Sequence, residues 1–428
     1  MESNAGTHNP PIESFDSIAP TWRKFMSRPH TKAAALSNHA LTHGRRGFLR
    51  VAGGGVIAAA LPAMAACSST LPAESVSAWQ VPTSGGADLR RWILAHAILA
   101  PHAHNRQSWL VELDQADTIV LRMDLTRMLP ETDPFARQMT LSQGTFVELL
   151  DMAARQSGHR ADISLFPEGM WDSKAADRRA TARIVLHADA SVRPDPLFAQ
   201  VFNRRTNRER YEATLPAVTA IDALRASCAA LPVKVGHVDQ RDPQATAEHR
   251  RIAGKAWQIE LHTPRTQLES VQLMRIGPGQ IARHRDGISI NDPFMRLLDT
   301  VGMVNREVAA APDSMGVTNQ IKDFDAKLVA TPAFAWITTE SNDRIAQINA
   351  GRAWLRMQLV ATEHGLSMHP LSQALQEYPE QRDTYQAIHR QLGATASGQT
   401  VQMWARLGHG PVIGPSPRRG VDAHIVSG

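Results

Sequence analysis

The sequence is poor in cysteine and lacks the common motifs of nucleophilic, metal-dependent and nucleotide-binding enzymes. Its 428 residues contain two cysteines, Cys67 and Cys228, which excludes a disulfide framework and a cysteine-rich metal site. G-x-S-x-G, H-E-x-x-H, G-x-x-x-x-G-K-[ST] and a G-x-G-x-x-G followed by an acidic residue are all absent. The chain therefore has no strong acid, base or nucleophile signature, as is typical of enzymes whose cofactor carries the chemistry.

The sequence also lacks a continuous basic run. Its 46 Lys and Arg against 41 Asp and Glu give a net charge of +5. Arginine pairs are scattered along the chain, at 45–46, 90–91, 178–179, 204–205 and 418–419. This distribution suits a few anion sites better than a nucleic-acid track. With 43% hydrophobic and 20% charged residues, the composition indicates a soluble globular protein, and we expect a small-molecule substrate and no nucleic acid.

Residues 1–70 are expected to be a disordered n-region followed by an export signal. Most of the stretch is polar and rich in His, Ser and Pro, which predicts disorder. The segment GRRGFLRVAGGGVIAAALPAMAAC (44–67) then places arginines before an apolar run. That run, 51–66, is shorter than the roughly 20 residues that a membrane helix needs, and it ends in small residues, as a signal peptidase requires.

Two features of this segment bear on the export route. Arg45 and Arg46, followed by Gly-Phe-Leu, resemble a twin-arginine signal, although Gly44 stands where Ser or Thr is usual. MAAC at 64–67 resembles a lipobox, so a lipid anchor at Cys67 is a second possibility and an uncleaved N-terminal anchor a third. Twin-arginine export moves proteins that are already folded around a cofactor. We therefore expect an exported, periplasmic cofactor enzyme.

The remaining chain contains an internal repeat. GTFVELLDMAARQSG (144–158) and GRAWLRMQLVATEHG (351–365) have apolar residues at matching positions. These recur every three or four residues, as on a buried helix face, and the closing glycine of each predicts a helix end. Each segment follows an apolar, strand-like run, at 109–124 and at 333–341.

The repeat predicts an α+β chain with two related halves, 84–195 and 196–428. Ala100-Pro101, ahead of the first strand-like run, has a possible counterpart in Ala311-Pro312. Three motifs occur once only, namely LAPHAHNRQSW (99–109), NRRTNRERY (203–211) and RLGHGPVIGPSPRRG (406–420). Because the two halves contribute different motifs, we expect one composite site between them.

The two motifs of the second half are rich in arginine. Arg204, Thr206 and Arg208 alternate, so in an extended segment their side chains leave one face. Two guanidinium groups with a hydroxyl between them suit a phosphate, although a solvated basic loop has the same pattern. Arg418 and Arg419 lie in a proline-stiffened tail and could bind the same anion.

The motif of the first half offers groups of another kind. Asn105 and Gln107 can each donate and accept hydrogen bonds, as the edge of a pyrimidine-like ring requires. His102 and His104 also alternate, which makes a metal pair conceivable, but no third ligand follows at a telling distance. Trp109, at the start of a strand, is more typical of a core residue than of a ligand platform.

Together these segments resemble the nitroreductase-like FMN-dependent oxidoreductases, in particular the single-chain, tandem Acg-like branch, over nearly all of 84–428. The resemblance also rests on DLTRMLPETDPFARQ (124–138) and GLSMHPLSQ (365–373), in that order relative to the other motifs. In that family two α+β protomers form an intertwined dimer that holds FMN at its interface. The resemblance thus implies a nitroreductase-like fold whose two halves imitate the dimer within a monomer.

The resemblance also implies a set of FMN-binding residues and no metal. Arg204 would contact the phosphate, Thr206 would supply a hydroxyl contact, and Arg208 would lie near the pyrimidine ring and N1. The segment of the partner protomer that lies over the cofactor corresponds to Pro101, His102, Ala103 and Asn105. Backbone amides near N5 correspond to Leu371, Ser372 and Gln373. The C-terminal phosphate contacts correspond to Arg418 and Arg419.

The chain departs from the family pattern at two positions within residues 101–108. Ser is usual where His102 stands, and Pro is usual where Ser108 stands. His102 is bulkier, so it could alter the hydrogen bonds of the flavin or fill part of the substrate pocket. The arginine and amide positions are kept, and FMN is still expected.

The expected function is that of an exported FMN-dependent oxidoreductase. The resemblance implies a ping-pong cycle in which electrons pass from NAD(P)H or another donor through flavin N5 to a nitroaromatic or quinone-type acceptor. The flavin, and no side chain, would carry the chemistry. A flavin-binding or flavin-sequestering protein without turnover is the alternative, and an exported solute-binding lipoprotein is a third possibility.

Overall fold

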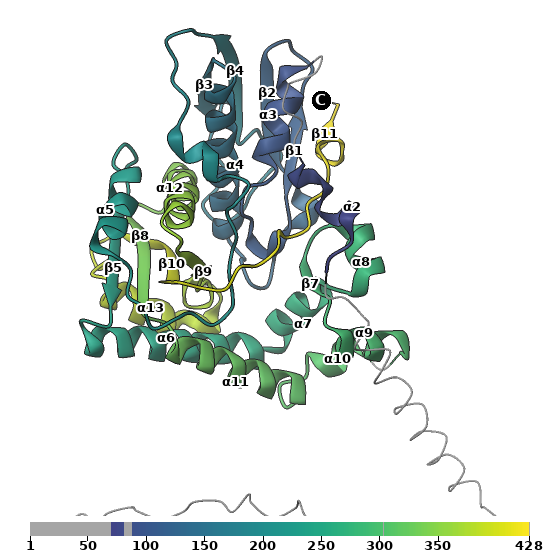
Figure 1. The fold of residues 1–428 in the computed structure, drawn as a ribbon, viewed down its shortest axis with the longest axis vertical. Coiled ribbons are helices and arrows are strands. Elements are labelled where there is room, and N and C mark those ends of the chain that lie inside the picture. The colour runs from purple at the N-terminus through teal and green to yellow at the C-terminus, as the bar shows by residue number, and fades with distance from the viewer. Residues whose placement is uncertain (1–69, 81–87, 303, 428) are drawn as a thin grey trace, which may run out of the picture. The chain divides into compact units, whose positions relative to one another are not determined.

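Two antiparallel β-sheets and a pair of long helices organise the chain in a computed structural model, which describes residues 70–80, 88–302 and 304–427 (Figure 1). The predicted α+β class is confirmed. The predicted export signal and Cys67 lie outside the described residues, as do residues 84–87 at the start of the predicted first half. No helix formed by the described residues combines the length and the apolarity needed to cross a membrane.

The first sheet contains the strands of the N-terminal part of the chain. These are β1 (Trp109–Glu112), β2 (Thr118–Met123), β3 (His159–Leu165) and β4 (Ala182–Ala188). They are antiparallel in the order β1-β2-β4-β3, and the C-terminal strand β11 (Ile425–Val426) adds to β1 in parallel (Figure 1). A strand from the C-terminal end of the chain therefore extends a sheet whose other strands come from residues 109–188.

The second sheet has the same strand order. Its strands are β5 (Lys234–Asp239), β8 (Ala333–Thr339), β9 (Ser367–Pro370) and β10 (Thr400–Gly408). They pair antiparallel in the order β5-β8-β10-β9. Strand β8 confirms the strand-like run predicted at 333–341. The shared order is the one that two related halves would have, and their relationship stays a prediction.

The two sheets are joined through helices α4 (Arg137–Gln156) and α12 (Arg344–Glu363), which pack against each other. At their crossing, a Cβ atom on Gly144 would lie 2.1 Å from the carbonyl oxygen of Ile348. One on Gly351 would lie 1.9 Å from the carbonyl oxygen of Leu141. The paired glycines of the repeat thus allow the two backbones to approach closely.

The two helices also end as the repeat predicts. Gly158 and Gly365 each stand one residue beyond the C-cap, with φ of +74° and +66°. This left-handed conformation is the usual helix ending and carries little strain in glycine. The predicted helix ends are therefore confirmed.

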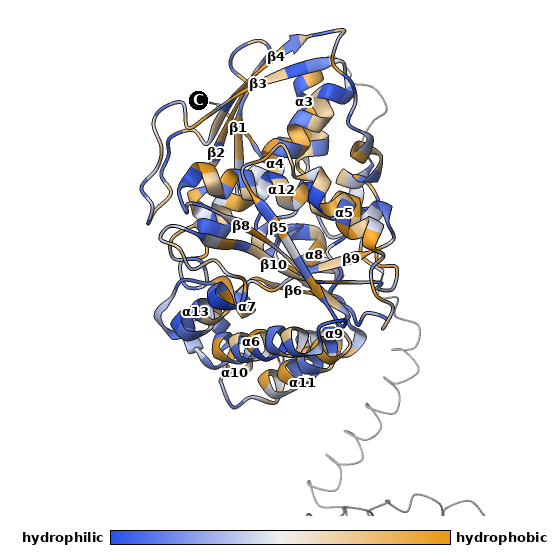
Figure 2. Ribbon diagram, turned by 90° about the vertical axis from the view of Figure 1, so that its left-hand side faces the viewer, coloured by the Kyte–Doolittle hydropathy of each residue, from blue (hydrophilic) through white to orange (hydrophobic). Residues whose placement is uncertain are grey.

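A long excursion between β5 and β8 was not anticipated from the sequence. Its elements are α6 (Pro243–His262), α7 (Pro264–Gln272), β6 (Met274–Ile276), α8 (Gly277–His284), β7 (Ile288–Ile290), α9 (Pro293–Thr300), α10 (Arg306–Ala309) and α11 (Met315–Val329). Figure 2 shows hydrophilic and hydrophobic residues mixed along α6 and α11, as in helices with one face on the protein and one in water. Ala311-Pro312 lies between α10 and α11, inside this excursion. Its pairing with Ala100-Pro101 was therefore wrong, because Ala100-Pro101 precedes β1, the strand whose place in the order of the second sheet is taken by β5 and not by β8.

Shorter helices complete the described chain. The α-helices are α2 (Ala73–Val76), α3 (Leu89–Ala97), α5 (Val218–Ser227) and α13 (Arg382–Gln391). The 3-10 helices are η1 (Ser77–Trp79), η2 (Ala103–Asn105), η3 (Leu125–Arg127), η4 (Pro196–Gln200), η5 (Gln373–Leu375), η6 (Pro379–Gln381) and η7 (Val421–Ala423).

Candidate functional site

The segment between α3 and β1, residues 99–109, has a strained backbone. His104, Asn105 and Gln107 have φ of 45°, 51° and 50°. Non-glycine residues held in such conformations cost about 1–3 kcal/mol each, and they occur where the surrounding structure enforces them, often at functional sites. We call residues 101–108 the strip.

Helix α4 anchors the start of the strip through two hydroxyl groups. Thr145 Oγ1 donates to the carbonyl oxygen of Pro101 at 2.7 Å. Ser142 Oγ accepts from the backbone N–H of Ala103 at 3.1 Å. The predicted positions Pro101 and Ala103 are therefore fixed by a helix that also forms the central crossing.

Both ring nitrogens of His102 form hydrogen bonds within the strip. Its Nδ1 lies 2.9 Å from the carbonyl oxygen of Ala103, and its Nε2 lies 3.1 Å from the backbone nitrogen and 2.8 Å from Oγ of Ser108. An amide N–H can only donate, so Nε2 is the acceptor and Nδ1 carries the proton. Burial lowers the pKa of His102 to about 3, so the ring is neutral. Neither nitrogen is free for a flavin or for the metal pair considered above.

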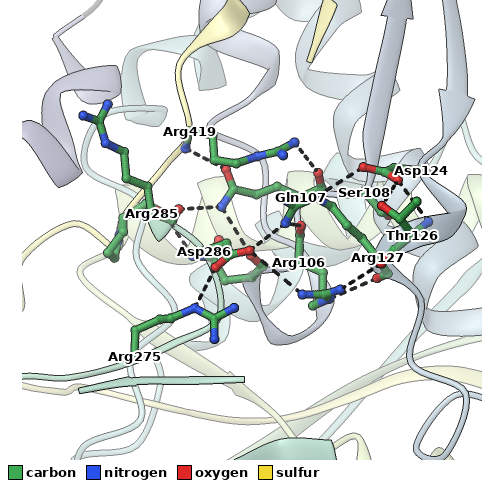
Figure 3. Close-up of polar contacts among 12 residues, drawn as sticks. Arg106, Gln107, Ser108, Asp124, Thr126, Arg127, Arg275, Arg285, Asp286 and Arg419 are labelled. Atoms are coloured by element: carbon green, nitrogen blue, oxygen red, sulfur yellow. Dashed lines mark hydrogen bonds and ion pairs between the residues drawn. The ribbon is translucent and has the colours of Figure 1, made fainter. Parts of the chain in front are cut away.

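The side-chain amides of the strip bind other parts of the chain. Asn105 Nδ2 donates to the carbonyl oxygen of Pro417 at 3.0 Å, and its Oδ1 accepts from Arg418 at 2.8 Å. Gln107 Nε2 donates to the carbonyl oxygen of Arg285, and its Oε1 accepts from the backbone N–H of Arg419 (Figure 3). These two residues therefore join the strip to the C-terminal tail and to the excursion. Contact of Asn105 with a flavin stays a prediction.

The two predicted arginine clusters meet at the start of the strip. Arg204 donates to the carbonyl oxygen of Leu99 at 3.2 Å, and Arg418 approaches the same oxygen at 3.4 Å. Arg418 also donates to the carbonyl oxygen of Ala100 at 3.0 Å. Their side chains belong to residues that are 3% and 2% exposed. Two buried guanidinium groups from distant segments therefore share one carbonyl oxygen.

These buried charges have no acidic counterpart among the described residues. Burial, followed by the charges of Arg418 and Arg205, lowers the pKa of Arg204 to about 9. Burial and then Arg205 lower the pKa of Arg418 to about 9. Buried charges are normally paired, so this cluster is suited to an anionic ligand.

Unfilled hydrogen-bond donors lie beside the cluster. Gln358, on α12, accepts from Arg204 at 2.7 Å through Oε1, while its Nε2 is buried without a partner in the described chain. Arg205 Nε is likewise buried and unpartnered there. A phosphate group accepts several charge-assisted hydrogen bonds, which fits this donor set. Sequence reasoning missed Gln358 because nothing in a helix interior distinguishes it.

Trp79, on η1, is a second residue of the cluster that sequence reasoning missed. Its ring centroid lies 4.8 Å from the guanidinium carbon of Arg205 and 5.5 Å from that of Arg418. Its Nε1 donates to the carbonyl oxygen of Ser416 at 2.8 Å. The aromatic face partly compensates the two positive charges and ties the start of the described chain to the tail.

Thr206 and Arg208 follow Arg204 in the same motif, and Thr206 lies beside β9. Thr206 forms an isolated parallel bridge with Met368. Arg208 is exposed, and after burial its charge is the largest cause that lowers the pKa of His104 to about 4. His104 Nδ1 is buried without a partner in the described residues. His104 therefore has the unfilled hydrogen-bonding capacity that His102 lacks.

The predicted amides at 371–373 are only partly available. Leu371 donates its N–H to the carbonyl oxygen of Trp404 at 2.7 Å. Ser372 and Gln373 begin the short helix η5, and the first N–H groups of a helix have no partner within it. Ser372 and Gln373 therefore remain the candidates for a ligand at this point.

Glu260, on α6, is a buried acid close to these amides. It is 3% exposed, and its carboxylate accepts from Gln376 Nε2 at 2.7 Å. Burial raises its pKa to about 7, against hydrogen bonds from Gln376 and Gln373 that lower it. Nothing in the sequence around Glu260 indicates this burial.

Glu260→Gln is expected to weaken the pH dependence of stability. The pKa of Glu260 rises from its usual 4.5 to about 7 on folding, so between these values the unfolded chain has released a proton that the folded protein keeps. The folded state thus loses up to roughly 3 kcal/mol as the pH rises through this window. Thermal unfolding should show that the variant gains stability at pH 8 and changes less at pH 5.

The control for this measurement is Glu363→Gln, at the exposed end of α12. It should leave the pH dependence unchanged. A Glu260→Gln protein with the same pH dependence as the wild type would contradict the role assigned to this carboxyl group.

The excursion is held against the strip through Asp286. Its carboxylate accepts from Arg127 at 2.6 Å and from Arg275 at 2.9 Å, and Arg106 lies 3.9 Å away (Figure 3). Burial acts in the opposite direction, yet the hydrogen bonds from Arg127 and Arg275 lower the pKa of Asp286. A backbone bond from Gly287 to the Asn105 carbonyl oxygen, at 3.2 Å, completes the contact. The excursion thus covers this end of the strip.

Comparison with known proteins identifies relatives by sequence. Two Mycobacterium tuberculosis proteins, from strains H37Rv and CDC 1551, both named "Putative NAD(P)H nitroreductase", are 27% identical over 338 residues, or 78% of this chain and 90% of theirs. No family model matches this chain.

Solved structures give weaker matches to this chain. The FMN-dependent nitroreductase NfnB of Mycobacterium smegmatis, in complex with NADPH, is 15% identical over 52% of this chain and 92% of its own, with a TM-score of 0.32. A nitroreductase of Bacteroides fragilis with bound FMN is 13% identical over 53% and 95%, with a TM-score of 0.30. These scores are low, so the relationship rests on the sequence match.

The structure brings the predicted segments together. Leu99 joins Arg204 to Arg418, Asn105 joins the strip to the tail, and Thr206 lies beside β9, which leads into 371–373. Within the described residues, no group of three His, Cys, Asp or Glu side chains is placed to hold a metal ion. The arrangement is a basic, partly buried cluster at the meeting of four segments.

Proposed function

We propose that the chain is an exported, FMN-dependent oxidoreductase that uses NAD(P)H or another donor to reduce a nitroaromatic or quinone-type acceptor. The observation that carries the proposal is the pair Arg204 and Arg418, buried without an acidic partner in the described chain and joined at the Leu99 carbonyl oxygen. The named activity of the sequence relatives supports it. An FMN phosphate would supply the missing negative charge.

The residues present fit FMN in type and in place. Arg204, with Gln358 behind it, would bind the phosphate, and Thr206 would add a hydroxyl. Arg208 would stabilise negative charge near N1 of the flavin, and the amides of Ser372 and Gln373 would donate toward N5. When bound, FMN supplies two-electron redox chemistry, and the protein supplies binding, orientation and electrostatics.

The tail arginines would contribute in different ways. Arg418 directs its donors at oxygen atoms of residues 98–105 and of the tail, so it holds these segments in place while adding positive charge. Arg419 donates to His424 and to the carbonyl oxygen of Gln107, while its Nε is unpartnered in the described chain. We assign Arg418 mainly to holding these segments in position. Arg419, which has an unpartnered donor, is the stronger candidate for a phosphate contact.

The proposal includes the monomeric pseudo-dimer. The same strand order in both sheets, and the crossing of α4 and α12 at paired glycines, support two related halves that share one site. Export by a twin-arginine signal, with a lipid anchor at Cys67 as an option, belongs to the proposal and is tested by locating the full-length protein in cell fractions.

The direct test is the visible absorbance of the purified protein, with and without added FMN. A protein that takes up one FMN and is bleached by NAD(P)H without oxygen would support the proposal. A protein that takes up no FMN would refute it.

A flavin-binding protein without turnover is the second candidate. The docking of Asp286 and Gly287 on the strip favours it, because this contact covers part of the site. In that case the protein would bind FMN, but neither NAD(P)H nor dithionite-reduced viologens would pass electrons through it to an acceptor.

A further inference from the structure

The two positions at which the strip departs from the family pattern are bonded to each other. We propose that His102 and Ser108 act as one positioning unit, whose hydrogen bonds hold residues 103–107 in the shape that presents the strip to its ligand. This inference rests on the proposed function for the identity of that ligand, FMN. It assigns His102 a place inside the turn, where the resemblance alone had placed it against the cofactor.

The bonds of the pair close the strained part of the chain. His102 lies before the three positive-φ residues and Ser108 directly after them, and Nε2 of His102 meets both N and Oγ of Ser108, at 3.1 and 2.8 Å. The ring is also packed edge-on against Trp109, with centroids 5.1 Å apart. Trp109 is fully buried, so the pair ties the strip to the core.

The chemistry of the pair depends on the backbone of residue 108. The backbone N–H of Ser108 donates to Nε2 of His102, whereas proline has no N–H to donate. Proline at position 108 would leave the Nε2 acceptor of His102 buried and unfilled, which is costly. A serine at position 102 has no ring nitrogen to fill. The His102 ring therefore depends on the backbone N–H of residue 108.

The pair acts through the backbone that it holds. His104 and Asn105 lie inside the closed turn, the first facing Arg208 and the second bonded to Arg418. Release of the turn would relax their positive φ values and move both groups relative to the arginine cluster. His102 and Ser108 are thus positioning residues that act on the arginine cluster through the backbone of residues 103–107.

A double-mutant cycle tests the proposal. The variants are His102→Ser, Ser108→Pro and the two together, which restores the residues usual in the family. Each single variant should raise the Kd for FMN about tenfold, whereas the double variant should return to within about twofold of the wild type. Ser108→Ala, which keeps the backbone donor, should have a smaller effect than Ser108→Pro.

The readouts are the Kd for FMN, measured by flavin fluorescence well below the unfolding temperature, and the flavin absorption maximum. A purely structural role would lower the unfolding midpoint and leave both unchanged. Additive effects in the double variant, or single variants with unchanged Kd, would overturn the proposal. If the wild type binds no FMN, the proposed function fails. The unfolding midpoints of the four proteins then test the pair, because additive changes of the midpoint would overturn the paired contact as well.

Discussion

Arg204→Met is expected to weaken FMN binding by about 100-fold while leaving the FMN-free protein at least as stable as the wild type. One or two charge-assisted hydrogen bonds to a phosphate are worth about 1.5–3 kcal/mol each, and every 1.4 kcal/mol is tenfold in affinity. Arg204 is the most buried arginine of its motif. Its loss would therefore remove the proposed phosphate contact that water replaces least well.

The effect on stability has the opposite expected sign because the charge is uncompensated. Methionine removes the hydrogen bonds to Gln358 and to the Leu99 carbonyl oxygen, which costs about 1 kcal/mol each. It also removes a buried charge that lies beside Arg418 and Arg205, and replacing buried charges by apolar groups of similar volume is often neutral or stabilising. FMN titration and thermal unfolding of the same sample measure both quantities.

Arg210→Met is the matched control, since Arg210 is exposed and belongs to the same motif. It should change neither the affinity for FMN nor the unfolding midpoint. An Arg204→Met protein that binds FMN as tightly as the wild type would contradict the assigned phosphate site. An Arg204→Met protein that fails to fold would show that Arg204 is required for folding. Arg204→Lys, which keeps the positive charge but lacks the guanidinium group, would then separate the role in folding from the role in phosphate binding.

The parts of the fold that the sequence predicts are those set by local pattern. The apolar spacing in 144–158 and 351–365 depends on the 3.6-residue period alone, and the glycines that end these helices depend on one backbone conformation. The strand at 333–341 is equally local. The arginine alternation also predicts an anion site, because the chemistry of guanidinium groups does not depend on the fold.

Other features depend on contacts between distant residues, which a single sequence does not reveal. His102 and Ser108 are six residues apart, yet only the left-handed turn between them makes them meet. Asn105 suits a pyrimidine edge by its donor and acceptor, and the tail satisfies the same two groups. The ion pair between Asp286 and Arg127 and the pairing of β11 with β1 likewise join residues that are far apart in the sequence.

Gly351→Ala is expected to destabilise the protein by about 3 kcal/mol, toward the upper end of the range for overpacking in a close-packed interior. In an open helix the same change would gain up to about 1 kcal/mol. Here the new Cβ would lie 1.9 Å from the Leu141 carbonyl oxygen and 3.0 Å from the Cα of Gly144. Both of these are backbone atoms, so α4 and α12 must move apart. Chemical unfolding followed by circular dichroism measures the loss.

Gly279→Ala, in α8, is the control, because a Cβ there would meet no atom within 4 Å. It should be neutral or slightly stabilising, and equal effects of the two changes would contradict the close crossing.

Separation of the helices should also reach the site, since α4 carries the hydroxyl groups that hold the strip and α12 carries Gln358 beside Arg204. The close approach at the two glycines thus sets the distance between the two sides of the proposed FMN site. Gly351→Ala should therefore weaken FMN binding even at temperatures where the protein remains folded, whereas Gly279→Ala should not.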